Sequence, residues 1–317
     1  MKFAKRCMAL TASTFLTVPV FAADVVAKQT KAEKELIDIY GKANVTVQLS
    51  DEGEGRFTEV KSNASRIGFK GTHALNDGLE VVYKAEFQVD MDGDDDVFKA
   101  RNQYIGLKGV YGEVLLGKND TMLKQSQGKV DLFNDLNADI KSLWKGENRM
   151  SDTISYKSPK FNGLQFGVTY ITEDSVEAED GVSLAVFYGD KKLKKSKIYA
   201  ALAHDSEVKG YDVTRAVVQG KISGITLGGI VQTQESVSTG AKLDGFMVSA
   251  KYKLGETTFK GQYQVGDNKD GDNKSGISAG VDYSLAKSTK LFAFYSSFDM
   301  DSAVDEDYLA VGIEYKF

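Results

Sequence analysis

A period-two alternation of apolar and polar residues runs through this sequence from about residue 39 to its end, and it constrains the fold more than any other feature. In residues 39–50 the odd positions are apolar or small, as at Val45 and Val47, whereas the even positions are polar, as at Thr46 and Gln48. Successive side chains of a β-strand point to opposite faces, and no helical face matches a period of two. The pattern therefore predicts strands with one apolar and one polar face.

Turn signals separate these segments. Short links such as Ser223-Gly224 and Gly255-Glu256 alternate with longer polar links such as 51–61 and 236–242. We expect about sixteen strands, at 38–50, 62–73, 79–90, 97–109, 111–118, 150–158, 164–173, 181–190, 196–205, 212–222, 225–235, 243–254, 257–267, 276–286, 290–300 and 307–317. Tight turns at one end and longer loops at the other are typical of a transmembrane β-barrel.

A soluble protein of two packed sheets is the competing all-β fold. It would bury one face of each strand in a dry core, but nearly every polar face here carries Lys, Glu, Gln or Arg. Burying such groups without partners costs free energy, whereas a water-filled interior accepts them. The sequence therefore predicts an all-β fold, a closed transmembrane antiparallel β-barrel of about 16 strands.

The first 22 residues have the pattern of a secretory signal peptide. Lys2, Lys5 and Arg6 precede an apolar stretch, and Val20-Phe21-Ala22 resembles a cleavage site. Cleavage would remove three positive and no negative charges, so the formal net charge of −5 would become −8, and it would remove Cys7, the single cysteine. We expect residues 23–37 to form a short N-terminal extension and residues 38–317 to form one barrel domain.

The residues that remain indicate no catalytic, cofactor-binding or metal site. An acidic mature chain is a poor binder of nucleic acid, because phosphate binding draws on clustered Lys and Arg. The acidic segment 90–96 lacks the spacing of a calcium loop, and we interpret it as a solvated loop. A membrane-embedded hydrolase is an alternative function, but His73 and His204 have no nucleophile motif beside them. We therefore expect no enzyme.

Several segments resemble the trimeric Gram-negative outer-membrane porins, the general diffusion porin family. They are Ser65-Arg66-Ile67-Gly68-Phe69-Lys70-Gly71, residues 101–109 with Tyr111-Gly112-Glu113-Val114 and Gly117-Lys118, and Arg149 and Tyr156 before Ser158-Pro159. The resemblance implies a homotrimer in the cell outer membrane that is exported through the periplasm. It also implies passive diffusion of ions and small hydrophilic solutes through a water-filled channel. A substrate-specific channel remains an alternative, although tyrosines such as Tyr252 and Tyr263 lie on the apolar face of their strands.

In that family the third loop folds into the barrel, and its acidic residues face arginines of the opposite wall. The long non-alternating segment 119–148 is the matching loop. The resemblance then implies a pore constriction formed by Arg66, Arg101, Arg149, Lys118, Asp131 and Asp135. The odd or even position of a residue in a strand, its parity, decides which face it lies on. Parity supports an inward position for Arg66, which falls on the polar face. It does not support Arg101, whose parity is shared by Ile105 and Leu107, so either those two pack inside or Asn102 lies at a subunit contact.

The last strand ends in an aromatic residue on its apolar face. Tyr315 and Phe317 resemble the C-terminal signal with which the family engages the barrel-assembly machinery, and Phe317 also fits an aromatic girdle at the membrane surface. Outer-membrane lipid and lipopolysaccharide are the further partners that the resemblance implies. The acidic net charge predicts a slight preference for cations.

Overall fold

The structure is a computed structural model that describes residues 37–76, 78–93, 97–173, 179–269, 271, 273–300 and 304–317. The expected signal peptide at 1–22 and nearly all of the expected extension at 23–37 lie outside these residues. Part of the acidic segment 90–96 does so as well.

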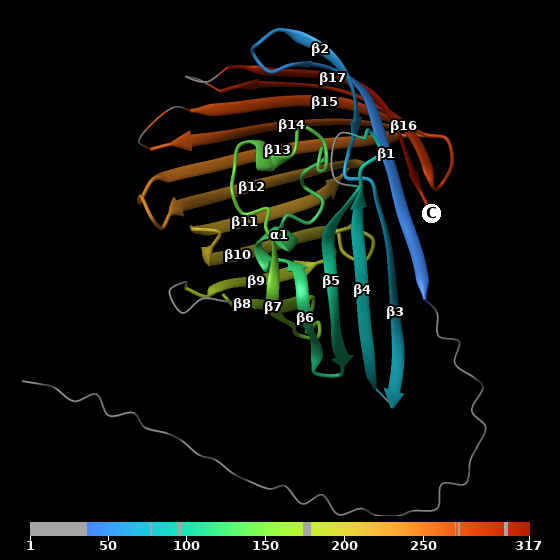
Figure 1. The fold of residues 1–317 in the computed structure, drawn as a ribbon, viewed down its shortest axis with the longest axis vertical. Coiled ribbons are helices and arrows are strands. Elements are labelled where there is room, and N and C mark those ends of the chain that lie inside the picture. Colours follow the sequence, from blue (N-terminus) through green and yellow to red (C-terminus); the bar gives the residue numbers. More distant parts are fainter. Residues whose placement is uncertain are drawn as a thin grey trace, which may run out of the picture. The chain divides into compact units, whose positions relative to one another are not determined.

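Strands make up most of the described chain (Figure 1). They are β1 (Asp38–Asp51), β2 (Arg56–Ser62), β3 (Arg66–Asn76), β4 (Leu79–Val89), β5 (Phe98–Gly109), β6 (Gly112–Asp120), β7 (Arg149–Lys157), β8 (Leu164–Ile171), β9 (Gly181–Gly189), β10 (Ile198–Val208), β11 (Tyr211–Ile222), β12 (Ile225–Ser236), β13 (Lys242–Leu254), β14 (Thr257–Asn268), β15 (Lys274–Ser284), β16 (Thr289–Asp299) and β17 (Glu306–Lys316). The helix α1 (Met122–Ser126) and the 3-10 helix η1 (Ile140–Ser142) lie between β6 and β7. No helix in the described part of the chain has the length and apolar character needed to cross a bilayer.

The strands form one closed antiparallel sheet. From β3 onward each strand pairs with the next along the chain, and β17 pairs with β1 from Lys42 opposite Lys316 to Asp51 opposite Asp307. Backbone hydrogen bonds in both directions between Gly41 and Phe317 continue this seam. Closure gives β1 and each strand from β3 to β17 two hydrogen-bonded neighbours, whereas β2 is registered against β1 alone.

Two of the seventeen strand segments are halves of one strand. β2 and β3 both pair with β1, but Val45 faces Ser62 whereas Lys42 faces Arg66, so the register shifts by one residue between the halves. Ala64 takes up the shift with a left-handed backbone, at φ 50°. In the described residues the wall therefore has sixteen strands, as expected, although the second strand begins at Arg56 and the loop before it is shorter than predicted.

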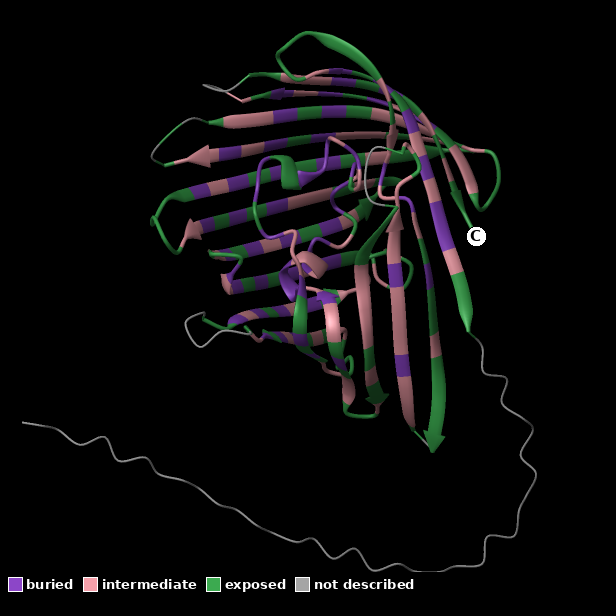
Figure 2. Ribbon diagram, viewed as in Figure 1, coloured by how far each residue is buried: buried purple, intermediate pink, exposed green. Residues whose placement is uncertain are grey.

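The alternation in the sequence becomes an apolar outside and a polar inside. In β1, Val47 is 52% exposed and Gln48 is 0% exposed. Figure 2 shows the same alternation of buried and exposed residues along most strands. Because a strand turns successive side chains to opposite faces, the exposed apolar residues cover the outer surface of the barrel.

The segment between β6 and β7 packs against the inner surface of this wall. Phe133 meets Phe294 of β16 edge to face, with 6.2 Å between the ring centroids. Trp144 donates from Nε1 to the carbonyl oxygen of Val265 in β14 at 2.8 Å, and its ring lies against Gly245, where a Cβ atom would come within 2.6 Å. Apolar burial and backbone hydrogen bonds thus hold residues 121–148 to the strands from β9 to β17.

Several connections at one end of the barrel are tight turns. At the end that holds the C-terminus, residues 110–111, 223–224 and 255–256 are two-residue turns, and Ser223-Gly224 has positive φ at both positions, as tight hairpins require. Residues 190–197, between β9 and β10, form an eight-residue connection at the same end.

Candidate functional site

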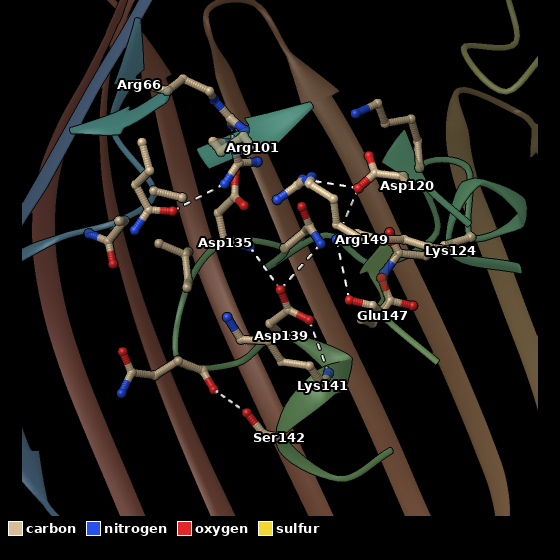
Figure 3. A pocket seen from close by; sticks show the side chains of 18 of the residues that line it. Arg66, Arg101, Asp120, Lys124, Asp135, Asp139, Lys141, Ser142, Glu147 and Arg149 are labelled. Carbon is tan, nitrogen blue, oxygen red and sulfur yellow. Dashed lines mark hydrogen bonds and ion pairs between the residues drawn. The ribbon is translucent and has the colours of Figure 1, made fainter. Parts of the chain in front are cut away.

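A charged cavity of about 730 Å³ lies between the segment 121–148 and the strands near β3 and β5 (Figure 3). Eight basic side chains line it: Lys61, Arg66, Arg101, Lys124, Lys129, Lys141, Arg149 and Lys191. Five acidic side chains line it: Asp120, Asp135, Asp139, Glu147 and Glu306. The chain therefore concentrates positive charge here despite its acidic net charge.

Asp135 projects from the loop toward basic residues of the wall. Its Oδ2 atom lies 2.7 Å from Nη2 of Arg66 and 2.8 Å from Nζ of Lys42. The backbone of Asp135 is left-handed, at φ 73°, and its N–H donates to Oδ2 of Asp139. Burial alone would raise the pKa of the Asp135 carboxyl, but the charges of Lys42 and Arg66 outweigh it and hold that pKa below its ordinary value. Asp135 is therefore a fixed negative charge of the loop.

Arg101 reaches the same cavity because β5 contains a β-bulge. Ala85 pairs with Gln103 but Phe87 pairs with Ala100, so Arg101 and Asn102 together oppose Glu86 alone. The extra residue reverses the parity of the strand on either side of it. Arg101 therefore points inward, and its Nε donates to Oε1 of Glu86 at 2.9 Å.

The bulge also resolves the parity conflict seen in the sequence. Ile105 and Leu107 are 58% and 47% exposed on the outer surface, so they do not pack inside. Asn102 accepts a hydrogen bond from Nε of Arg149 and donates one to Asp120. Asn102 thus belongs to the interior network, and neither explanation offered for the conflict was right.

Arg149 is held by groups of β5 and β6. Its Nη2 lies 3.0 Å from Oδ1 of Asp120, an oxygen that Lys124 also approaches at 3.3 Å. Arg66, Arg101 and Arg149 come from three different strands and line one cavity, as Figure 3 shows. The three arginines expected at a constriction are therefore brought together.

Two expected residues lie elsewhere. Lys118 donates to the hydroxyl of Ser151 and does not line the cavity. Asp131 is buried within the loop, where it accepts the backbone N–H groups of Phe133 and Ile140. Burial and the charge of Asp139 raise the pKa of the Asp131 carboxyl well above its ordinary value. Asp131 therefore stabilises the loop through its own backbone and does not face the arginines.

Three residues of this network were not predicted from the sequence. Lys42 pairs with Asp135, Glu86 orients Arg101, and Asp120 pairs with Arg149. Lys42 and Glu86 both fall on the polar parity of their strands, so the alternation offered a signal for them. Asp120 ends β6, where the alternation stops and offers none.

A buried ion pair ties the loop to the opposite wall. Arg215 of β11 is 0% exposed, and its Nη1 lies 2.6 Å from Oε1 of Glu147. Nε of Arg215 donates to Gln232 of β12, which in turn donates to the carbonyl oxygen of Lys145. Burial raises the pKa of Glu147, although the charge of Arg215 opposes this. The pair fixes the end of the loop that leads into β7.

Phe317 lies at the seam that closes the barrel. Its ring covers Gly41, where a Cβ atom would come within 2.2 Å of the ring, and Tyr315 lies beside it with 5.9 Å between ring centroids. Both aromatic side chains are about half exposed. The two expected C-terminal residues thus form an aromatic pair at the last point of pairing with β1.

His204, one of the two histidines considered for a hydrolytic site, lies in β10. His204 faces outward, with Nδ1 2.9 Å from the hydroxyl of Thr214, and it lies away from the charged cavity. Across the described ranges, no group of three or more His, Cys, Asp or Glu residues is placed to hold a metal ion.

These features define a class of protein. A closed barrel of sixteen strands with an apolar exterior and a charged interior is a transmembrane β-barrel. A sequence comparison identifies the family: the family model described as Gram-negative porin matches residues 9–303. The chain therefore belongs to the Gram-negative porin family, and it is an outer-membrane protein.

The sequence is similar to major outer membrane proteins P.IB. It is 32% identical to that of Neisseria sicca over 177 residues, which cover 54% of this chain and 48% of that protein. This chain thus spans about half the length of that relative. It is 25% identical to that of Neisseria meningitidis serogroup B (strain MC58) over 287 residues, or 80% of this chain and 85% of the relative.

Solved porin structures share the fold. An anion-selective porin from Comamonas acidovorans has a TM-score of 0.75 at 21% identity, covering 90% of this chain and 100% of that one. OmpF of Salmonella typhi, in a complex with daunomycin, has a TM-score of 0.73 at 18% identity, covering 89% and 98%. At these identities the similarity shows a common barrel and nothing about solutes.

Proposed function

We propose that this protein is a general diffusion porin, a passive water-filled channel for ions and small hydrophilic solutes across the outer membrane. The observation that carries the proposal is the contact of Asp135 with Lys42 and Arg66 inside the barrel, where a charge of the inward-folded loop pairs directly with charges of the wall. Fixed charges in a narrow aqueous passage select ions by sign and leave uncharged solutes to be sorted by size.

The proposed constriction is lined by Arg66, Arg101 and Arg149, and Asp135 of the loop lies within it, paired with Arg66 and Lys42. Asp120 and Glu86 hold two of the arginines in place. Local charges dominate selectivity, because distant loop charges are screened beyond about 8 Å at physiological salt. Eight basic and five acidic side chains line the cavity, and this excess of positive charge favours anions. We therefore expect a preference for anions, based on the charge of the cavity and not on the acidic net charge of the chain.

A substrate-specific channel is the second candidate. An aromatic track for sugars would need several tyrosines along the interior, but Tyr308 is the one tyrosine among the described residues that line the charged cavity, and Tyr252 and Tyr263 are exposed on the outer surface. The charges of the cavity favour a channel that sorts by charge and size.

Liposome swelling tests the proposal. Swelling rates with unrelated neutral solutes, such as sugars and amino acids, should fall with molecular size alone. Saturation with one solute would support the substrate-specific channel. In planar bilayers, the reversal potential under a salt gradient should show a modest preference for anions. The absence of any conductance would refute the channel itself.

The assembly is proposed on the same basis. A structure of OmpT of Vibrio cholerae is described as a trimer form, and it shares this fold with a TM-score of 0.70. We expect a homotrimer whose insertion depends on the barrel-assembly machinery reading Tyr315 and Phe317, within lipid and lipopolysaccharide. Cross-linking should yield trimers, and conductance should close in three equal steps.

A further inference from the structure

The connection between β9 and β10 departs from the other turns of its end of the barrel. Residues 190–197 contain five lysines, Lys191, Lys192, Lys194, Lys195 and Lys197. Instead of extending away from the wall, part of this turn folds inward. Leu193 packs against the apolar cluster that contains residues of the loop 121–148, and Lys191 lines the same charged cavity as the arginines.

The turn has a defined conformation. The carboxylate of Asp190 accepts the backbone N–H groups of Lys192, Lys194 and Lys195, at 2.9 to 3.1 Å. Leu193 adopts a left-handed backbone, at φ 53°, which places its side chain toward the apolar cluster. The position of Lys191 is therefore set by an organised turn.

Lys129 approaches from the loop. Its carbonyl oxygen accepts a hydrogen bond from Gln219 of β11 at 2.9 Å. The preceding Gly128 lies against the ring of Tyr199, where a Cβ atom would come within 2.6 Å. Tyr199 is the second residue of β10 and donates to the carbonyl oxygen of Ser126, so one residue connects the loop to the strand that follows the lysine turn.

The charges of the turn and the loop act on one another. Burial and the nearby charges of Lys191 and Lys192 lower the pKa of Lys129. The carboxylates that act on Lys191 are already engaged: Asp120 pairs with Arg149 and Lys124, and Asp190 binds its own backbone. Within the described residues, neither Lys129 nor Lys191 has a carboxylate partner. Their positive charge is therefore left uncompensated.

We propose that Lys129 and Lys191, with Lys192 beside them, bind the phosphate group of a small anionic solute in transit. The site lies in the same cavity as the arginines, on the side where the β9–β10 turn enters. Two ammonium groups from opposite elements suit a multivalent anion, because each supplies a point charge with three donors. A chloride ion would bind the two ammonium groups more weakly than a phosphate group does. The site therefore distinguishes phosphate compounds from monovalent anions. The proposal rests on the channel function proposed above.

The test is block of chloride current by pyrophosphate in planar bilayers that contain the full-length, assembled protein. Pyrophosphate should reduce the current of the native channel at constant ionic strength. The double variant K129Q/K191Q should raise the half-blocking concentration about fivefold, since two partly exposed ion pairs of about 0.5 kcal/mol each together contribute about one kcal/mol. The control K194Q/K195Q removes the same charge from lysines outside the cavity and should change the value less than twofold.

The outcomes separate this site from the channel function. A native channel that conducts chloride but is not blocked by pyrophosphate overturns the phosphate site and leaves the porin function standing. Equal loss of block in the two double variants would assign the effect to general charge and overturn the site as well. If K129Q/K191Q fails to assemble, K191Q alone, at an exposed turn residue, should still raise the half-blocking concentration about twofold. An unchanged value in that variant overturns the proposal.

Discussion

Arg215 of β11 and Glu147 of the third loop form an ion pair at 2.6 Å that is closed to solvent on the arginine side. Removing one member of such a pair leaves a buried charge unpaired, which typically costs about 3–5 kcal/mol. We therefore expect this ion pair to hold the third loop firmly against β11.

We expect Arg215→Met to loosen the loop and lower the temperature at which the barrel loses its heat-modifiable mobility on gels. The single-channel current should also become noisier. The double variant R215M/E147Q removes both charges and should recover most of the loss in stability. A double variant as unstable as R215M would show that the pair itself is not the cause.

Charge changes at the constriction should move ion selectivity in opposite directions. R66Q/R149Q should shift the reversal potential toward cations, and Asp135→Asn should shift it toward anions. One unit charge about 8 Å from an ion in water contributes about 0.5 kcal/mol, or about a twofold change in local ion concentration. Lys118→Gln is the matched control, because Lys118 lies outside the cavity. Unchanged reversal potentials in both constriction variants would remove these residues from the ion path.

The charge of Asp135 should persist in acid. The charges around it hold its pKa below the ordinary value of about 3.9, so it stays ionised as the pH falls from 7 to about 4. A carboxyl with a depressed pKa contributes stability above its unfolded pKa, and that contribution is lost as the pH falls through the folded pKa. The difference in reversal potential between the native protein and D135N should therefore remain at pH 4. Its disappearance near pH 5 would contradict the ion pairs with Lys42 and Arg66.

The barrel seam should depend on the absence of a side chain at Gly41. Gly41→Val would place carbon atoms where the Phe317 ring lies, and overpacking of this kind costs about 1–3 kcal/mol. We expect less folded protein in the outer membrane, with normal conductance in the channels that do form. Deletion of Phe317 should impair assembly in the same way.

Gly271→Val is the control for the seam variant, because a Cβ atom at Gly271 meets nothing within 4 Å. Heat-modifiable protein at native levels in both G41V and the Phe317 deletion would show that the aromatic seam is dispensable.

The position of Arg101 shows where reasoning from the sequence stops. Parity along a strand holds only while the register is unbroken, and the bulge opposite Glu86 adds a residue that no local pattern marks. The same limit explains Asp131 and Asp135. They are four residues apart in an irregular loop, and only the folded loop turns one toward its own backbone and the other toward Arg66.

The sequence by itself determined the strands, the closed barrel with its polar interior, and the family, because a period of two over some 280 residues leaves few other folds. The tertiary structure alone decided which charges come together. Lys42, Arg66 and Asp135 are distant in the sequence, and Lys129 shares a cavity with Lys191 of the lysine turn only because the loop packs against β10 and β11. Charge pairing depends on distances of a few ångströms across the barrel, and those distances are set by bulges, register and loop packing rather than by any local pattern.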